Sequence, residues 1–369
     1  MDNEKETILE TKNLSYRYEG GKQALKNVSV KIPTGCKVAF IGPNGAGKST
    51  LFMHFNGILK PTEGEVEYNS NKVEHTKKGL LGLRKEVTFV TQNPDDQIFN
   101  VIVEDDVAFG PFNLDLPLDE IRKRVKDALK MVGMEEERSR PIHHLSFGQR
   151  KRVAVASALA MYPKVLIMDE PTAGLDPEMV YRLYEIADEV NMSGSTVIIS
   201  THDIETAYSW ADLVIVLFDG EVLAQGTPFE VFSMKDVLDK AGLSVPMIHK
   251  LNEFMKENVK DSVYGRTMTT TLMNIRQNIE PGTLFVMRPG YEGETHGRIG
   301  VYGSMSRSFA ESKDIAVELR FNAIERCIEE VIGGKDSTLY LDASLSHVLQ
   351  HKLSDVALHG VNIKTEERQ

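Results

Sequence analysis

The chain has 369 residues, of which 41% are hydrophobic and 26% are charged, and its formal net charge is -11. This composition is typical of a globular protein and excludes a largely disordered chain. The acidic balance argues against a nucleic-acid-binding protein, which usually carries a basic surface. At roughly 100–200 residues per domain, the length predicts two or three domains.

The two cysteines, Cys36 and Cys327, lie far apart in the sequence. They indicate a reducing compartment rather than a disulfide framework. The polar, acidic start MDNEKETILE does not resemble a secretory signal. No run of 18 apolar residues occurs, so we expect no membrane-spanning helix, and any membrane role should depend on a partner.

Residues 1–242 alternate between segments typical of buried strands and segments with helical periodicity. The predicted strands include residues 37–41, 165–168, 197–200 and 213–218, and the predicted helices include residues 118–132, 149–161 and 178–191. This alternation favours an α/β domain with a mostly parallel sheet covered by helices on both faces. Asp219-Gly220, between two apolar runs, predicts a tight hairpin turn.

Apolar periodicity weakens over residues 243–282, which we interpret as a connector with a helix at 247–259. Beyond it, the sequence predicts short strands at 284–287, 300–302, 337–341 and 361–364, and helices at 315–331 and 345–358. Residues 283–369 are therefore predicted to form a small C-terminal α/β domain, for which we expect a regulatory or dimer-stabilising role.

One segment fits the phosphate-binding pattern G-x-x-x-x-G-K-S/T in full. It reads Gly42-Pro43-Asn44-Gly45-Ala46-Gly47-Lys48-Ser49-Thr50. It follows a predicted strand and opens a predicted helix. Glycines allow backbone N–H groups to face phosphate oxygens, and the helix N-terminus favours an anion. We expect Lys48 to reach the β- and γ-phosphates of ATP and Ser49 to hold Mg²⁺.

Two carboxylates follow the apolar run 165–168. Asp169 is expected to position Mg²⁺ through water, and the side chain of Glu170 should point in a different direction. Glu170 is therefore the candidate base, or orienting group, for an attacking water. Taken alone, this run also fits a strand that simply ends in solvated acids.

The segment Leu145-Ser146-Phe147-Gly148-Gln149 begins 20 residues before Val165. Together with the phosphate loop, the acidic strand and the later His202, in this order, it resembles the ABC ATPase family over residues 7 to about 240. The resemblance implies a P-loop NTPase domain with a mostly parallel sheet, an antiparallel β subdomain and a helical subdomain. It also implies that Ser146, Phe147, Gly148 and Gln149 form the signature that meets the ATP of an opposite subunit.

The same resemblance gives roles to further residues. Tyr18, with Tyr16 as the alternative, corresponds to the aromatic residue that stacks on adenine. Gln92 corresponds to the glutamine that touches Mg²⁺ or water and couples to the membrane partner. Asp176, in the loop 173–176, signals between two ATPase subunits, and His202 senses the γ-phosphate. Each of these residues also has an ordinary structural explanation, such as a strand aromatic, a loop amide or a helix cap.

Phe147 departs from the family pattern, which usually has glycine at this signature position. The signature's contact with the opposite nucleotide is expected to use mainly Ser146 and backbone N–H groups. Gly148 is retained, so the backbone can still approach closely there.

The segments 90–99 and 103–111 resemble the energy-coupling factor branch of the family, and in particular the cobalt/nickel import ATPases. This implies an ATPase that powers a membrane importer, with cobalt or nickel ions as the expected cargo and a vitamin as the alternative. It further implies a peripheral position at the cytoplasmic face of the cell membrane. The implied partners are a transmembrane coupling subunit, a substrate-binding membrane subunit and a second ATPase subunit, either the same chain or a sister.

A competing interpretation is a soluble ABC ATPase that acts on nucleic acid or the ribosome. Such proteins usually carry a coiled-coil insertion or two tandem cassettes, and this sequence has neither feature and no basic patch. A third interpretation is an enzyme domain fused at the C-terminus, but residues 283–369 show no nucleophile–base pair.

Two features of the C-terminal domain invite a binding hypothesis. His347, His351 and Asp355 are spaced by one helical turn and could form a regulatory transition-metal site, although a solvated helix face is the favoured alternative. The glycine-containing segment 297–307 could bind an anion, or it could simply connect a strand to a helix.

Overall fold

The computed structural model describes residues 6–21, 23–258, 265–267, 270–271, 280–319, 322–358 and 360–368. The chain divides into two compact units, Met1–Pro246 and Met247–Gln369. The predicted connector 243–282 falls partly outside the described residues, and its predicted helix corresponds to α10 (Met247–Asn258). None of the described helices is long and apolar enough to cross a membrane.

The first unit contains an antiparallel sheet with the strand order β2-β1-β4-β5. Apolar and polar residues alternate along its strands, as expected for a sheet with one buried face: in β2, Val28, Val30 and Ile32 are buried between exposed neighbours. The strands are β1 (Thr7–Arg17), β2 (Gln23–Pro33), β4 (Glu63–Tyr68) and β5 (Asn71–Lys72).

A second, six-stranded sheet has the order β10-β9-β3-β8-β7-β6, and all its pairs are parallel except β9 with β10. Its inner strands β7 and β8 are buried along their whole length, as expected for parallel strands covered on both faces. Asp219 and Gly220 both have positive φ and form the predicted hairpin turn. The strands are β3 (Lys37–Ile41), β6 (Val87–Val90), β7 (Val165–Met168), β8 (Thr196–Ser200), β9 (Leu213–Phe218) and β10 (Glu221–Gly226).

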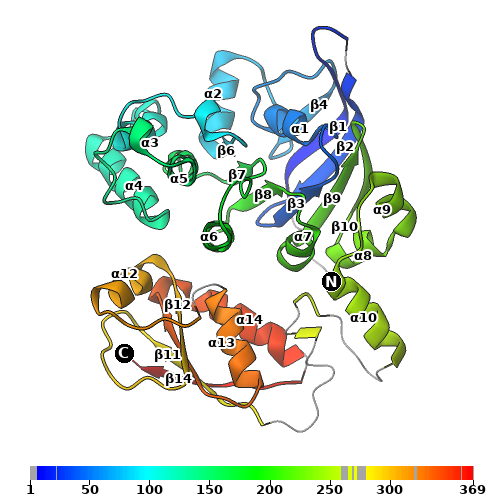
Figure 1. The fold of residues 1–369 in the computed structure, drawn as a ribbon. Helices are drawn as coiled ribbons and strands as arrows, with labels where there is room; N and C mark the ends of the chain where they lie inside the picture. The colour runs from blue at the N-terminus through cyan, green and yellow to red at the C-terminus, as the bar shows by residue number, and fades with distance from the viewer. Residues whose placement is uncertain are drawn as a thin grey trace. The chain divides into compact units, whose positions relative to one another are not determined.

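Helices α3, α4 and α5 pack on one another and gather at one side of this unit, away from the antiparallel sheet (Figure 1). The unit thus combines a parallel sheet, an antiparallel β part and a helical part, which confirms the predicted fold class. Its helices are α1 (Lys48–Phe55), α2 (Lys77–Glu86), α3 (Val103–Phe112), α4 (Leu118–Met131), α5 (Phe147–Leu159), α6 (Pro177–Met192), α7 (Ile204–Trp210), α8 (Pro228–Ser233) and α9 (Lys235–Ala241), with short 3₁₀ turns at η1 (Pro94–Asp96) and η2 (Ile142–His144).

The core between the two sheets holds the phosphate loop in place. Phe52 and Phe55 of α1 are fully buried, and both contact the ring of Phe40 in β3. Burying a phenylalanine side chain contributes about 1.5–3 kcal/mol, so these rings fix the helix that begins at Lys48 relative to the strand that precedes the loop.

The second unit contains a parallel four-stranded sheet with the order β12-β13-β11-β14. Helix α13 packs on β12, β13 and β11, and helix α14 packs on α13. The elements that follow α10 are β11 (Thr283–Met287), β12 (Arg298–Tyr302), α12 (Ser304–Ser312), α13 (Ala323–Ile332), β13 (Ser337–Leu341), η3 (Ala343–Leu345), α14 (Ser346–Leu358) and β14 (Lys364–Arg368).

Two predicted elements of this unit differ from the structure, and one helix was not predicted. The helix predicted at 315–331 begins only at Ala323, because Ile315, Val317 and Leu319 alternate with a period of two and Leu319 bridges to β12. Helix α12 was not predicted at all. The last strand lies at Lys364–Arg368 rather than 361–364, where it pairs with β11.

Candidate nucleotide site

The phosphate loop between β3 and α1 passes very close to neighbouring backbone. A Cβ atom on Gly42 would lie 2.0 Å from the carbonyl oxygen of Leu217, and one on Gly47 would lie 2.8 Å from that of Ala24. Both glycines also have positive φ, at 142° and 107°. Any other residue would therefore displace the loop from the sheet, which explains the two terminal glycines of the pattern.

Lys48 is buried at the base of this loop. Its Nζ donates to the carbonyl oxygens of Gly42 (2.8 Å) and Pro43 (3.2 Å) and lies 3.9 Å from Oε1 of Glu170. Burial lowers the pKa of Lys48, while the carboxylates of Glu170 and Asp169 act in the opposite direction. The loop thus carries a fixed ammonium group where the pattern predicts phosphate oxygens.

A cavity of about 390 Å³ opens over the loop. Its wall combines the phosphate loop with one aromatic residue, one amide and one carboxylate: it is lined by Tyr18, Ala24, Asn44, Gly45, Ala46, Gly47, Lys48, Ser49, Thr50, Gln92 and Glu170. Tyr18 is held there by a 3.0 Å hydrogen bond between its hydroxyl and that of Thr50. Tyr16, the alternative, packs instead against the buried ring of His54.

Asp169 is buried at the end of β7, and a serine that sequence analysis did not identify fixes its position. Ser200, the fully buried last residue of β8, donates to Oδ1 of Asp169 at 2.5 Å. The same hydroxyl accepts the backbone N–H of Glu170 at 2.8 Å. One side chain therefore orients the two neighbouring acids, a role that depends on the parallel pairing of β7 with β8.

The carboxylate of Glu170 is held from two sides. Nε2 of Gln92 lies 2.9 Å from Oε2, and Nε2 of His202 lies 2.6 Å from Oε1. Glu170 itself has a φ of 40°, a left-handed conformation that costs of order 1–3 kcal/mol for a residue with a side chain. These residues follow β6, β7 and β8, whose carboxyl ends meet at one edge of the sheet.

The signature residues begin helix α5 and do not line this cavity in the described structure. Ser146 is the N-cap: its hydroxyl accepts from the backbone of Gln149, whose side chain accepts from the Ser146 N–H. Phe147 lies against the loop 173–176, where a Cβ on Gly174 would be 3.0 Å from its ring. Asp176 caps helix α6 through the N–H of Met179.

Lys151, also overlooked in the sequence, is the most deeply buried lysine near the site, at 1% exposure. Its Nζ donates to the carbonyl oxygens of Thr91 (3.1 Å) and Gln92. Burial lowers its pKa to about 8, against the opposing influence of Asp169 and Glu170. Its sequence context, Arg150-Lys151-Arg152, is typical of a solvated helix face and gave no sign of this burial.

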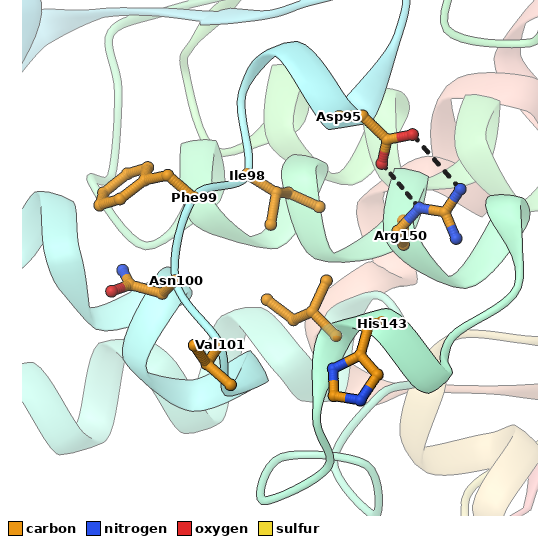
Figure 2. A pocket seen from close by; sticks show the side chains of 8 residues that line it. Asp95, Ile98, Phe99, Asn100, Val101, His143 and Arg150 are labelled. Carbon is orange, nitrogen blue, oxygen red and sulfur yellow. Dashed lines mark hydrogen bonds and ion pairs between the residues drawn. The ribbon is translucent and has the colours of Figure 1, made fainter.

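An open groove of about 500 Å³ lies beside the segment that follows Gln92. Figure 2 shows the ion pair between Asp95 and Arg150 at one end and Phe99 with Asn100 at the other. Phe99 and Val101 are 60% and 67% exposed, so the groove offers apolar surface to the solvent. The remaining lining residues are Ile98, Ile142 and His143.

The structure does not form the metal site predicted in the second unit. His351 lies 3.5 Å from Asp355, but no group of three His, Cys, Asp or Glu side chains is placed to hold a metal among the described residues. His347 and His351 are exposed, while Val348, Leu349 and Val356 face the core. The three residues therefore belong to the solvated face of helix α14, the favoured interpretation, and the described residues do not support the metal hypothesis.

The segment 297–307 connects strand β12 to helix α12, the ordinary interpretation of its sequence, and the anion hypothesis is not supported because Asp342 occupies the N-terminus of that helix. The buried carboxylate of Asp342 accepts from the backbone N–H groups of Met305 (3.0 Å) and Ser306 (2.6 Å) and from the Ser306 hydroxyl (2.6 Å). A Cβ on Gly303 would lie 2.4 Å from the same carboxyl group. The N-terminus of α12 is thus closed by Asp342.

Comparisons with known proteins decide the family. The profile of the ABC transporter family matches residues 25–173. The energy-coupling factor transporter ATP-binding protein EcfA of Methanocaldococcus jannaschii is 50% identical over 271 residues, which are 73% of this chain and 96% of that protein. This chain belongs to the ABC transporter ATP-binding proteins. EcfA of Methanosphaera stadtmanae is 48% identical over 247 residues, covering 67% of this chain and 89% of that protein.

Solved structures of ABC ATPases agree with this family. The structure of cbiO1 from Clostridium perfringens, described as part of the ABC transporter complex cbiONQ, has a TM-score of 0.57 and 46% identity and covers 68% of this chain and 100% of its own. A dimeric ATP-binding cassette with bound ADP and Pi has a TM-score of 0.56 and 32% identity, over 60% of this chain and 99% of its own. The resemblance to ABC ATPases is therefore confirmed: this protein is an ATPase that binds ATP.

Proposed function

We propose that this ABC ATPase is the ATP-hydrolysing subunit of an energy-coupling factor importer and acts peripherally at the cytoplasmic face of a membrane. The observation that carries ATP hydrolysis is the Glu170 carboxylate, which Gln92 and His202 hold beside Lys48 at the phosphate loop. The 50% identity with EcfA supports the importer type. Residues 1–242 form its nucleotide-binding domain, 243–282 a connector and 283–369 a small domain with a regulatory or dimer-stabilising role.

The residues at the site suit ATP with Mg²⁺. Ser49, Gln92 and Asp169 would hold the metal, and their hydroxyl, amide and carboxylate oxygens are the hard donors that Mg²⁺ prefers. Ser49 and Gln92 line the same cavity, and Asp169 is fixed next to it by Ser200. A Mg²⁺ ion held there would neutralise charge on the phosphate oxygens during transfer of the γ-phosphoryl group from ADP to water.

Each side chain of the site has a separate role in the reaction. Lys48 and the N–H groups of the loop stabilise the phosphate charge, which is the largest contribution in phosphoryl transfer. Glu170 accepts a proton from the attacking water or orients it. Gln92 and His202 keep the Glu170 carboxylate in place, and Tyr18 offers its ring to adenine.

A second ATPase subunit completes the site. Ser146, Phe147, Gly148 and Gln149 lie outside the described lining of their own chain's cavity, as expected for groups that meet the ATP of a facing subunit. Asp176 follows the loop that Phe147 contacts and would carry the signal between the two subunits. The dimeric cassette with ADP and Pi supports this arrangement.

The groove of Figure 2 is proposed as the surface that docks the transmembrane coupling subunit. It is apolar and exposed at Phe99 and Val101, and it begins only a few residues after Gln92, which contacts Glu170. An apolar segment that enters this groove would therefore press on the loop that reaches the catalytic carboxylate. A further membrane subunit would bind the cargo.

Cobalt or nickel ions are the proposed cargo, and a vitamin is the alternative. The 46% identity with cbiO1, part of the complex cbiONQ, supports placing this chain with that type of transporter, as do the segments 90–99 and 103–111. An ATPase acting on nucleic acid or the ribosome is less well supported, since the chain carries a net charge of -11.

The proposal is tested by purifying the protein from native membranes in mild detergent and identifying bound proteins by mass spectrometry. A multi-spanning partner in fixed stoichiometry is expected, together with a second ATPase copy or a sister. Val101→Asp should reduce recovery of the membrane partner, while Leu81→Asp, at another exposed apolar position, on α2, should not. Recovery of the chain alone or with ribosomes would overturn the transport function.

A further inference from the structure

The segment 91–97 is attached to helix α5 at three points. Arg150 pairs with Asp95 (2.7 Å between Nε and Oδ1), Lys151 donates to the carbonyl oxygens of Thr91 and Gln92, and Gln97 donates to the carbonyl of Ala154 at 2.8 Å. The three residues of α5 that make these contacts, Arg150, Lys151 and Ala154, follow directly after the signature. Hydrogen bonds and one ion pair thus connect segment 91–97 to α5 from one end of the segment to the other.

Lys151 has a distinct place among these contacts. It is 1% exposed, whereas Arg150 and Asp95 lie at the edge of the groove with side chains 24% and 53% exposed. A buried ammonium group is costly unless its hydrogens are bonded, and here two carbonyl oxygens accept them. Of the three attachments, the one made by Lys151 is the one that reaches Gln92.

The contact continues from the main chain of Gln92 to its side chain. While Lys151 holds the carbonyl of Gln92, the side-chain Nε2 of the same residue donates to Oε2 of Glu170 at 2.9 Å. A shift of the Gln92 backbone would therefore move its amide away from the carboxylate. Misplacing a catalytic group by about 1 Å can cost about 10²-fold in rate.

We propose that Lys151 is a positioning residue for ATP hydrolysis: it fixes the main chain of Gln92 so that the Gln92 amide holds the Glu170 carboxylate. This inference rests on the proposed function, because it takes Glu170 as the group that acts on the attacking water. Lys151 itself does not line the described nucleotide cavity, so it acts through Gln92 rather than on ATP.

Arg150 and Lys151, neighbours in α5, connect segment 91–97 to two different parts of the site. Arg150 joins the groove to the signature, since its Nη1 also donates to the carbonyl of Leu145 at 2.8 Å. Lys151 joins the same helix to Gln92 and hence to Glu170. A displacement of segment 91–97 would therefore shift both the signature and the Glu170 carboxylate.

The test is Lys151→Met, which keeps the length and apolar stem of the side chain and removes its hydrogen bonds. At saturating Mg²⁺ we expect kcat for ATP to fall by about 10- to 100-fold with little change in KM, because Lys48 and the phosphate loop are untouched. Lys37→Met is the matched control: Lys37 is a partly buried lysine paired with Asp188, and its loss should leave kcat unchanged. Thermal denaturation verifies that each variant is folded, and Lys151→Gln replaces a variant that does not fold.

A double-mutant cycle separates positioning from general support of the fold. In a Gln92→Ala background, Lys151→Met should lower kcat by less than about 2-fold, since the amide that it positions is already gone. Equal losses in both backgrounds, or a folded Lys151→Met enzyme with normal kcat, would overturn the inference. A Glu170→Gln enzyme with normal turnover would instead overturn the proposed site itself.

Discussion

The side-chain amide of Gln92 and the carboxylate of Glu170 meet across 2.9 Å, although the two residues lie 78 positions apart in the sequence. Each follows the carboxyl end of a strand, β6 or β7, and these strands are parallel neighbours. The contact joins the loop beside the exposed apolar groove directly to the group proposed to act on water.

Glu170→Gln should abolish turnover while leaving nucleotide binding intact. The amide cannot accept a proton, so we expect kcat to fall by about 10²-fold or more. ATP affinity should stay close to that of the wild type, because Lys48 and the loop glycines are unchanged. Steady-state ATPase assays and fluorescent-nucleotide binding measure the two effects, with the exposed Glu221→Gln as control. Near-normal turnover would remove Glu170 from its assigned role.

Ser200→Ala should weaken both stability and Mg²⁺-dependent turnover. The buried Asp169 carboxylate and the Glu170 N–H would each lose a partner, and an unsatisfied buried group costs about 1–3 kcal/mol. Urea denaturation gives the stability change, and ATPase rates at varied Mg²⁺ give the functional one. Ser209→Ala, whose hydroxyl bonds only within α7, should change neither. A Ser200→Ala protein identical to wild type in both assays would contradict the orienting role of Ser200.

His54 should make the first unit sensitive to acid. Its ring is fully buried, donates from Nδ1 to the carbonyl of Thr50 and packs on Tyr16, and burial lowers its pKa from 6.5 to about 4. Because the folded state disfavours the protonated ring, the stability it contributes is complete above pH 6.5 and is lost as the pH falls from 6.5 towards 4. Between pH 7.5 and 5, this predicts a loss of about 2 kcal/mol.

The measurement is urea denaturation of the nucleotide-free protein at several pH values, compared with His54→Phe. The phenylalanine variant should lose about 2 kcal/mol less on acidification, whatever its stability at pH 7.5. An identical pH dependence in both proteins would show that His54 is not the group responsible.

Gly174→Ala should disturb the loop 173–176 next to the signature. The new Cβ would lie 3.0 Å from the ring of Phe147, and the glycine has a φ of 76°, a conformation that costs an alanine about 1–2 kcal/mol. Adding Phe147→Ala should relieve the clash but not the backbone strain, so only part of the stability returns. Urea denaturation of the single and double variants distinguishes the two contributions, and full recovery would exclude backbone strain.

The sequence allowed the phosphate loop, the two acids and the strands that carry them to be predicted, because these are local patterns with their own chemistry. Ser200 and Lys151 could not be found in this way. Their roles depend on which strands become neighbours, and an ordinary serine at a strand end or a lysine in a basic run has no local signal. In the second unit, helix α12 was missed because the residue that caps its N-terminus, Asp342, lies 36 residues beyond Ser306 in the sequence. The residues just before the helix therefore carry no capping signal.

The Asp342 carboxylate determines what the N-terminus of α12 is able to bind. A helix that follows a parallel strand through a glycine turn normally has free N–H groups at its N-terminus that can bind an anion. Here the carboxylate of Asp342 accepts hydrogen bonds from the N–H groups of Met305 and Ser306 instead. A phosphate group arriving there would meet like charge. We therefore expect no phosphate group, free or carried by a nucleotide, to bind at this helix end.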